Sequence, residues 1–142
     1  MIAFLDTSSL VKLYHHELGS DHLMGLLDAG IEDIYLSELA ILEFQSAMWR
    51  KVREGKLSLE SATSAISLFQ GDRDQFRWIK LDITAVDRAS ALLARYGSLG
   101  LRTLDALQFA SALFLRDKDC VFPVSYTHLR AHETKANLVC RL

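Results

Sequence analysis

The stretch that decides the fold is residues 1–9, which read MIAFLDTSS. Ile2 to Leu5 form a short, continuous apolar run, which is typical of a strand that is buried on both faces of a parallel sheet. The run stops at Asp6, and the hydroxyl side chains of residues 7–9 favour the start of a helix. The pattern predicts a β-strand that leads directly into an α-helix, with Asp6 at the carboxyl end of the strand.

Further short apolar runs alternate with helical patterns along the chain. Three of these runs predict strands, at residues 34–36, 78–81 and 120–122. Cap residues and apolar periodicity predict helices that begin near Leu10, Ser20, Ser37, Ser58, Thr84 and Thr103 and end near Gly19, Gly30, Gly55, Gln70, Gly97 and Arg116. This alternation predicts an α/β fold, a three-layer α/β/α sandwich with a short parallel sheet. The helix at Thr103 is apolar on most sides, so we expect it to be buried.

Composition and charge exclude several classes of protein. Half of the 142 residues are hydrophobic, and seven glycines and one proline are too few for a collagen-like, low-complexity or disordered chain. Sixteen Lys and Arg against eighteen Asp and Glu give a net charge of −2, so binding to nucleic acid requires a local basic patch. Cys120 and Cys140 have no C-x-x-C spacing, which argues against a disulfide scaffold and a cysteine zinc site. Because no apolar stretch is long enough to span a membrane, we expect a soluble, cytoplasmic protein.

Three acids are candidates for chemistry. Asp6 lies at the carboxyl end of a predicted strand, where open α/β folds bind ligands, although capping of the next helix is an alternative role. Asp105 lies in the first turn of its predicted helix, flanked by apolar positions, and stabilisation of the helix dipole is its alternative role. Glu43 lies opposite the apolar stripe of its helix, which predicts a solvated side chain, but its small neighbours leave room for a ligand.

Other groupings are less specific. A basic cluster lies near the end of the helix predicted from Ser37 and consists of Arg50, Lys51, Arg53 and Lys56. This cluster fits a solvated surface as well as it fits a phosphate contact. His128 and His132 have the spacing of a zinc half-site, with Glu133 beside them, but this is not a full ligand set. No glycine loop for phosphates and no motif of a hydrolytic triad are present.

Three motifs, in this order, resemble those of the PIN domain family. They are LDTS at residues 5–8, SELAILE at residues 37–43 and LRTLDALQ at residues 101–108. The resemblance covers residues 1–122, and within the family it points to the VapC-type toxins of bacterial toxin–antitoxin pairs. It implies an α/β/α sandwich with a short parallel sheet, the same fold that the pattern of strands and helices predicts.

The resemblance implies a metal-dependent endoribonuclease. Asp6 and Asp105 match the family's principal metal-binding acids and Glu43 matches its helix-borne acid, so the resemblance implies that all three are catalytic. Glu43 or Asp6 would orient the attacking water, and Thr7 or Ser8 would lie beside the water shell of the metal. The implied metal is Mg²⁺ or Mn²⁺, because these ions prefer oxygen ligands and retain several waters. The implied partners are an RNA substrate, a cognate antitoxin protein and a second copy of the chain in a homodimer.

The last part of the chain departs from the family pattern. The family has a further acid after its fourth strand, then a helix and a strand, whereas residues 124–132 contain no acid and residues 125–134 resemble translated sequencing-adapter read-through. We therefore interpret residues 1–122 as a PIN-like domain and residues 123–142 as an atypical tail, a non-native replacement for the last acid, helix and strand. Two alternatives stay open, a catalytically impaired PIN-like module that binds RNA or protein and a flap-type DNA nuclease.

Overall fold

A four-stranded parallel sheet lies at the centre of the computed structural model, which describes residues 1–123. The strands are β1 (Ile2–Phe4), β2 (Asp33–Ser37), β3 (Arg77–Ile79) and β4 (Cys120–Val121), in the order β3-β2-β1-β4. In the central strand β1, Ala3 is in register with Ile34 on one side and with Val121 on the other. The predicted parallel sheet is confirmed, and its strands are as short as the apolar runs indicate.

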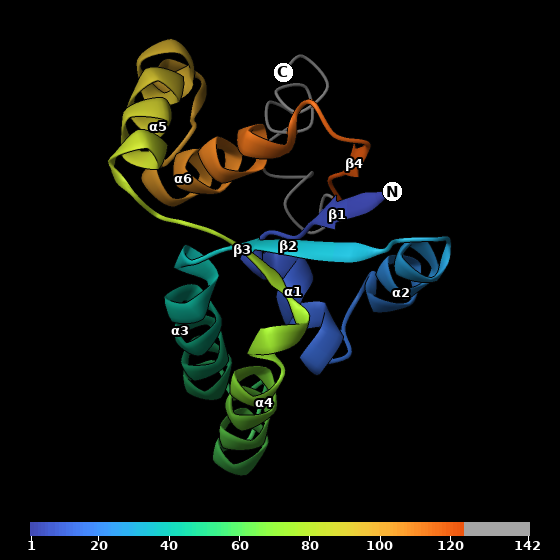
Figure 1. The fold of residues 1–142 in the computed structure, drawn as a ribbon. Coiled ribbons are helices and arrows are strands. Elements are labelled where there is room, and N and C mark those ends of the chain that lie inside the picture. The colour runs from blue at the N-terminus through green and yellow to red at the C-terminus, as the bar shows by residue number, and fades with distance from the viewer. Residues whose placement is uncertain (124–142) are drawn as a thin grey trace.

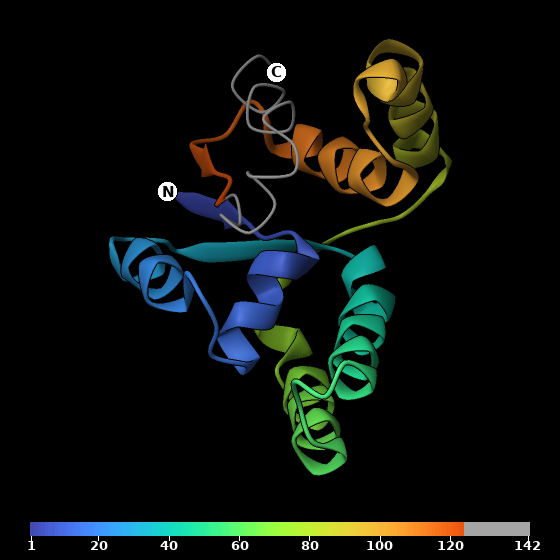
Figure 2. The same ribbon diagram turned by 180° about the vertical axis from the view of Figure 1, so that it is seen from behind.

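Within residues 1–123, six α-helices cover the two faces of the sheet. They are α1 (Thr7–Tyr14), α2 (Ser20–Asp28), α3 (Leu39–Arg53), α4 (Leu59–Gly71), α5 (Ile83–Tyr96) and α6 (Thr103–Ala112). Three short 3₁₀ turns join them to their neighbours, at η1 (Arg73–Gln75), η2 (Gly97–Leu99) and η3 (Leu113–Leu115). Helices α1 to α4 lie on one side of the sheet and α5 and α6 on the other, as the views from the front and from behind both show (Figures 1 and 2). The predicted three-layer sandwich is therefore confirmed for these residues.

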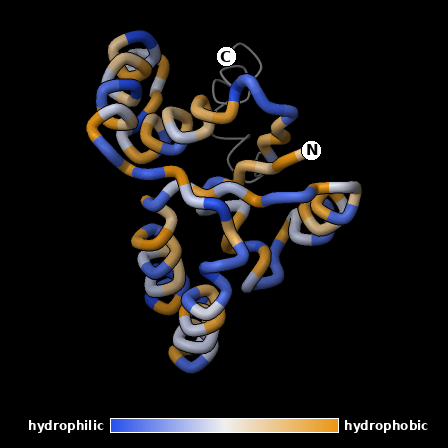
Figure 3. Tube along the Cα trace, viewed as in Figure 1, coloured by the Kyte–Doolittle hydropathy of each residue, from blue (hydrophilic) through white to orange (hydrophobic). Residues whose placement is uncertain are grey.

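Two clusters of buried apolar side chains hold the layers together. The larger cluster joins β1 and β2 to α1–α4, and in it the rings of Phe44 and Phe69 lie 4.5 Å apart. The smaller cluster joins α5 and α6 and includes Phe122, whose ring stacks on Phe4 at 5.4 Å. Hydrophobic and hydrophilic residues alternate along the helices, as amphipathic helices on a sheet require (Figure 3). None of the helices in residues 1–123 has both the length and the apolar character needed to cross a membrane.

The first two helices differ from their predicted bounds. Helix α1 ends at Tyr14 instead of Gly19, and the backbone of Gly19 (φ 90°) adopts the left-handed conformation that glycine tolerates before α2. Ser20 does not cap α2. Its hydroxyl accepts a hydrogen bond from the backbone N–H of Glu17 and donates one to the carbonyl oxygen of Lys12, so Ser20 fastens the connection between the helices.

The helix starts are also shifted, by one or two residues. Asp82, and not Thr84, caps α5, because its carboxylate accepts from the backbone N–H of Ala85 at 3.1 Å. Helix α3 begins at Leu39, and the buried hydroxyl of Ser37 accepts from its backbone N–H at 3.3 Å. The predicted cap of α4 at Ser58 is confirmed.

Helix α6 is less buried than its sequence predicts, and it ends at Ala112, where η3 takes over, instead of at Arg116. Leu104 is 51% exposed and Phe114 is 40% exposed. Leu104 is in the first turn of α6. One face of the Phe114 ring is covered by Arg88 of α5, whose guanidinium lies 4.1 Å from the ring centroid in a cation–π contact. The prediction of burial on most sides is therefore wrong at these two positions.

Candidate functional site

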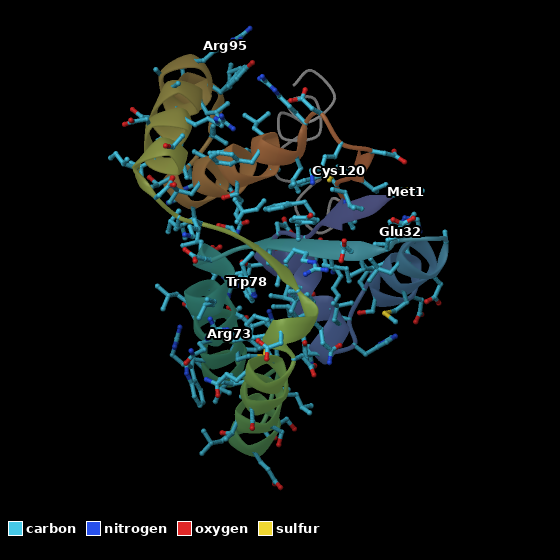
Figure 4. All side chains as sticks on the ribbon, in the orientation of Figure 1. Met1, Glu32, Arg73, Trp78, Arg95 and Cys120 are labelled. Carbon is cyan, nitrogen blue, oxygen red and sulfur yellow. The ribbon has the colours of Figure 1, made fainter. Side chains whose placement is uncertain are left out.

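The candidate acids gather at the carboxyl edge of the sheet. Backbone hydrogen bonds from Leu5 N to Tyr35 O and from Glu38 N to Ile79 O continue the ladders to this edge. The opposite, amino-terminal edge carries Met1 and Glu32, whose ammonium and carboxylate groups lie 3.7 Å apart (Figure 4). Because β1, β2 and β3 are parallel, the segments that follow them leave the sheet on the same side.

Asp6 comes directly after β1 and is the N-cap of α1. Its Oδ1 accepts a hydrogen bond from the backbone N–H of Ser9 at 2.8 Å. The side chain thus performs the capping role that the sequence left as one of two readings. Capping engages one oxygen toward the helix and is compatible with a ligand role for the carboxylate, because Asp6 lies at the edge where open parallel sheets bind ligands.

Glu43 is held by two donors that come from other helices. Its Oε1 accepts from Thr7 Oγ1 of α1 at 2.9 Å and from Gln108 Nε2 of α6 at 2.6 Å. Gln108 Nε2 also donates to Thr7 Oγ1 at 3.1 Å, which closes a triangle of contacts between α1, α3 and α6. The expectation of a solvated Glu43 is wrong, because the side chains of Thr7 and Gln108 reach its carboxylate and leave it partly buried.

The pKa of Glu43 depends on burial and on the charges of the other two predicted acids. Burial raises the pKa of Glu43 above its ordinary value, while the hydrogen bonds from Gln108 and Thr7 oppose the rise. The negative charges of Asp6 and Asp105 raise the pKa of Glu43 further. The structure thus brings Asp6 and Asp105, from two other helix starts, close enough to affect the ionisation of Glu43.

Asp105 occupies the first turn of α6 and is half-buried. It precedes Gln108 by three residues, so the two lie on the same face of the helix. One face of α6 therefore presents both the predicted acid and the amide that contacts Glu43. Sequence reasoning assigned no role to Gln108, although a buried glutamine within an apolar helix is a signal that could have revealed it.

The chemistry of the donors fits a hydrated Mg²⁺ or Mn²⁺ ion. Carboxylate oxygens are the preferred ligands of these ions, and Mg²⁺ is commonly held by one or two carboxylates while it keeps several waters. Within residues 1–123, no three His, Cys, Asp or Glu side chains form a ready metal-binding group. A divalent ion held by one or two carboxylates in this region would therefore have to keep several of its waters.

Two lysines of the basic cluster form ion pairs with glutamates other than Glu43. Lys51 of the basic cluster pairs with Glu17 at 2.7 Å, and Lys56 pairs with Glu54 at 2.7 Å. The charges of these two lysines are thus offset by the neighbouring glutamates. The grouping of His128, His132 and Glu133, like most of the tail predicted at residues 123–142, lies outside the described residues.

Solved structures of toxins share this fold. VapC20 of Mycobacterium tuberculosis, a sarcin-ricin loop cleaving toxin, is 18% identical over 83% of this chain and 84% of that chain, with a TM-score of 0.62. A toxin–antitoxin complex from Klebsiella pneumoniae is 19% identical over 80% of each chain, with a TM-score of 0.56. VapBC2 from Rickettsia felis, bound to a DNA fragment from its promoter, is 16% identical over 92% of each chain, with a TM-score of 0.60. No curated protein matches the sequence.

The family match extends over most of the chain. The family model described as PIN domain matches residues 3–118, a range that includes Asp6, Glu43, Asp105 and Gln108. The matched range includes the six α-helices of the described residues, strands β2 and β3 and most of β1, and the three sequence motifs lie within or at the edge of the site. The chain therefore belongs to the PIN domain family.

Proposed function

We propose that this protein is a metal-dependent endoribonuclease and the toxin of a toxin–antitoxin pair. The observation that supports the proposal is the proximity of Asp6, Glu43 and Asp105 at the carboxyl edge of the sheet. There the negative charges of Asp6 and Asp105 raise the pKa of Glu43. Membership of the PIN domain family and the shared fold with a toxin that cleaves the sarcin-ricin loop support this activity.

The three acids divide two tasks in the proposed reaction. Asp6 and Asp105 hold Mg²⁺ or Mn²⁺, which when bound supplies a more acidic water and offsets the charge that develops on the scissile phosphate. Glu43 orients the attacking water and accepts its proton, a role that suits a carboxylate whose pKa is raised toward neutrality by burial. Thr7 and Gln108 hold Glu43 in place through its Oε1.

The proposed substrate is single-stranded or looped RNA. Such a strand has a flexible backbone, so a scissile phosphate can be presented to carboxylates at a sheet edge without opening a duplex. The proposed partner is a small antitoxin protein, since the Klebsiella structure is a complex of this kind. We also propose a homodimer and a cytoplasmic location, as the family resemblance and the cysteine usage indicate.

Cleavage assays with matched RNA and DNA strands test the proposal. With Mn²⁺, we expect cleavage of the RNA, complete loss of cleavage in excess chelator and loss in Asp105→Asn. Asp87→Asn is the matched control, because Asp87 is an exposed acid on α5, a helix that supplies none of the candidate site residues. Cleavage that persists in chelator would overturn the mechanism, and preferential cleavage of DNA would favour the flap-type nuclease.

A second candidate function is a PIN-like module that binds RNA or protein without cutting it. The absence of any acid from residues 124–132 favours it, because the family pattern has an acid after the fourth strand. This candidate predicts RNA binding that Mn²⁺ does not alter and no cleavage under any of the conditions above.

A further inference from the structure

Gln108 is a buried amide at the centre of the candidate site. Its side chain is 6% exposed, and its Nε2 donates to Glu43 Oε1 at 2.6 Å and to Thr7 Oγ1 at 3.1 Å. Because Thr7 Oγ1 itself donates to Glu43 Oε1 at 2.9 Å, both donors converge on the same carboxylate oxygen. The amide is thus the link by which α6 fixes the side chain of α3.

The other end of the same amide is unsatisfied. Within residues 1–123, Gln108 Oε1 is a buried side-chain atom that has no hydrogen-bond partner. An apolar side chain of similar size would fill this position without burying an unpaired acceptor, so stability alone does not account for glutamine. The orientation of the amide is nevertheless determined, since turning it over would direct Oε1 at the carboxylate of Glu43 and bring two acceptors together.

The two donors leave the second carboxylate oxygen of Glu43 for another contact. In the described part of the chain, the hydrogen bonds of Glu43 all go to Oε1, and Oε2 is not among the buried atoms without a partner. Oε2 is therefore the oxygen that is left for a further contact. With Oε1 fixed on two sides, the direction in which Oε2 points is also fixed.

From these contacts we infer that Gln108 is the positioning residue of the site, which anchors Glu43 through Oε1 and directs Oε2 at the attacking water. The anchoring is a property of the metal-free protein. Only the contact between Glu43 Oε2 and the attacking water rests on the proposed function. Gln108 touches neither substrate nor metal in this account and acts through Glu43.

Two readouts separate the anchoring from the activity. In metal-free protein, we expect the side-chain amide protons of Gln108 to exchange with solvent at least about tenfold more slowly than those of Gln70, an exposed glutamine on α4. In Gln108→Leu, the ¹³C carboxyl resonance of Glu43 should shift while those of exposed glutamates stay in place. With RNA and Mn²⁺, kcat should fall about 10- to 100-fold with little change in KM, as for other residues that orient an active-site ligand.

Gln70→Leu is the control for the Glu43 resonance and for kcat, and both should match the wild type. If Gln108→Leu does not fold, Gln108→Met keeps an unbranched side chain and gives the same comparison. An unchanged Glu43 resonance together with a wild-type kcat would overturn the inference. A shifted resonance in a protein that never cleaves RNA would support the anchoring and reject the proposed function, so the two failures are distinguishable.

Discussion

Two substitutions of Asp6 separate its role as a helix cap from its role as a metal ligand. The carboxylate accepts from Ser9 N at 2.8 Å, and Asp6→Ala removes that acceptor from the start of α1. Loss of an N-cap acceptor costs about 1 kcal/mol, within a range of roughly 0.5–2 kcal/mol. For a domain of this size, 1 kcal/mol corresponds to a fall in Tm of roughly 3–5 °C.

Asp6→Asn should behave differently. Asparagine caps helices about as well as aspartate, so the acceptor for Ser9 N remains, while the charge that repels Glu43 disappears. We therefore expect the free energy of unfolding of metal-free Asp6→Asn to stay within about 0.5 kcal/mol of the wild type. Both variants should lose the stabilisation by Mn²⁺, which for a single site amounts to about 2.7 kcal/mol at a concentration of 100 times Kd.

Thermal unfolding followed by circular dichroism, in chelator and then in Mn²⁺, measures all of these quantities. If Asp6→Asn in chelator is as unstable as Asp6→Ala, the negative charge and not the cap supports α1. If Asp6→Asn keeps the full stabilisation by Mn²⁺, Asp6 is not a metal ligand, and the division of roles among the acids is refuted.

Three further predictions concern the network around the site and the fold that carries it. Because burial raises the pKa of Glu43, ionisation of this carboxyl group lowers the free energy of unfolding as the pH rises. Glu43→Gln should therefore stabilise the metal-free protein at pH 7, and this gain should vanish near about pH 4. Urea unfolding at both pH values measures the gain, and an equal gain at both would contradict the prediction. Burial alone would raise the pKa of Glu17, but the hydrogen bonds and charges of Lys51 and Lys12 outweigh burial and lower this pKa. The Glu17 carboxylate therefore stabilises the fold at pH values above the ordinary glutamate pKa, and acid titration should destabilise the wild type more than Glu17→Gln. Ser9→Ala removes the buried hydrogen bond to the carbonyl oxygen of Pro123 (3.0 Å) and should lower the free energy of unfolding by about 1 kcal/mol, whereas no change would mean that this contact does not form in solution.

The position of Asp6 could be predicted because its causes are local. A short apolar run predicts where β1 ends, and hydroxyl residues predict where α1 begins, so the residue between them must lie at the carboxyl edge of the sheet. The same holds for the buried positions Phe44 and Met48 on α3, which follow from helical periodicity alone. Local pattern therefore determined the strands, most of the helices and one acid of the site.

The environment of Glu43 could not be predicted in this way. Helical periodicity gives the side of α3 on which Glu43 lies, but not which element covers that side. Gln108, which covers it, is separated from Glu43 by sixty-five positions. A contact between distant segments therefore decides the environment of Glu43. The end of α1 was missed for a different, local reason, because Lys12 in this helix donates to Glu17 and to the carbonyl oxygen of Leu18, which follow the helix.

Direct measurement of Mn²⁺ binding tests the central claim, that Asp6 and Asp105 hold a divalent metal at the edge of this sheet. The free hydrated ion gives a strong electron paramagnetic resonance signal, so titration of the metal-free protein reports how much Mn²⁺ is bound. We predict saturable binding by the wild type and by Asp87→Asn, and a severe loss of binding in both Asp6→Asn and Asp105→Asn. Equal binding by all four proteins, or none by the folded wild type, would contradict the account.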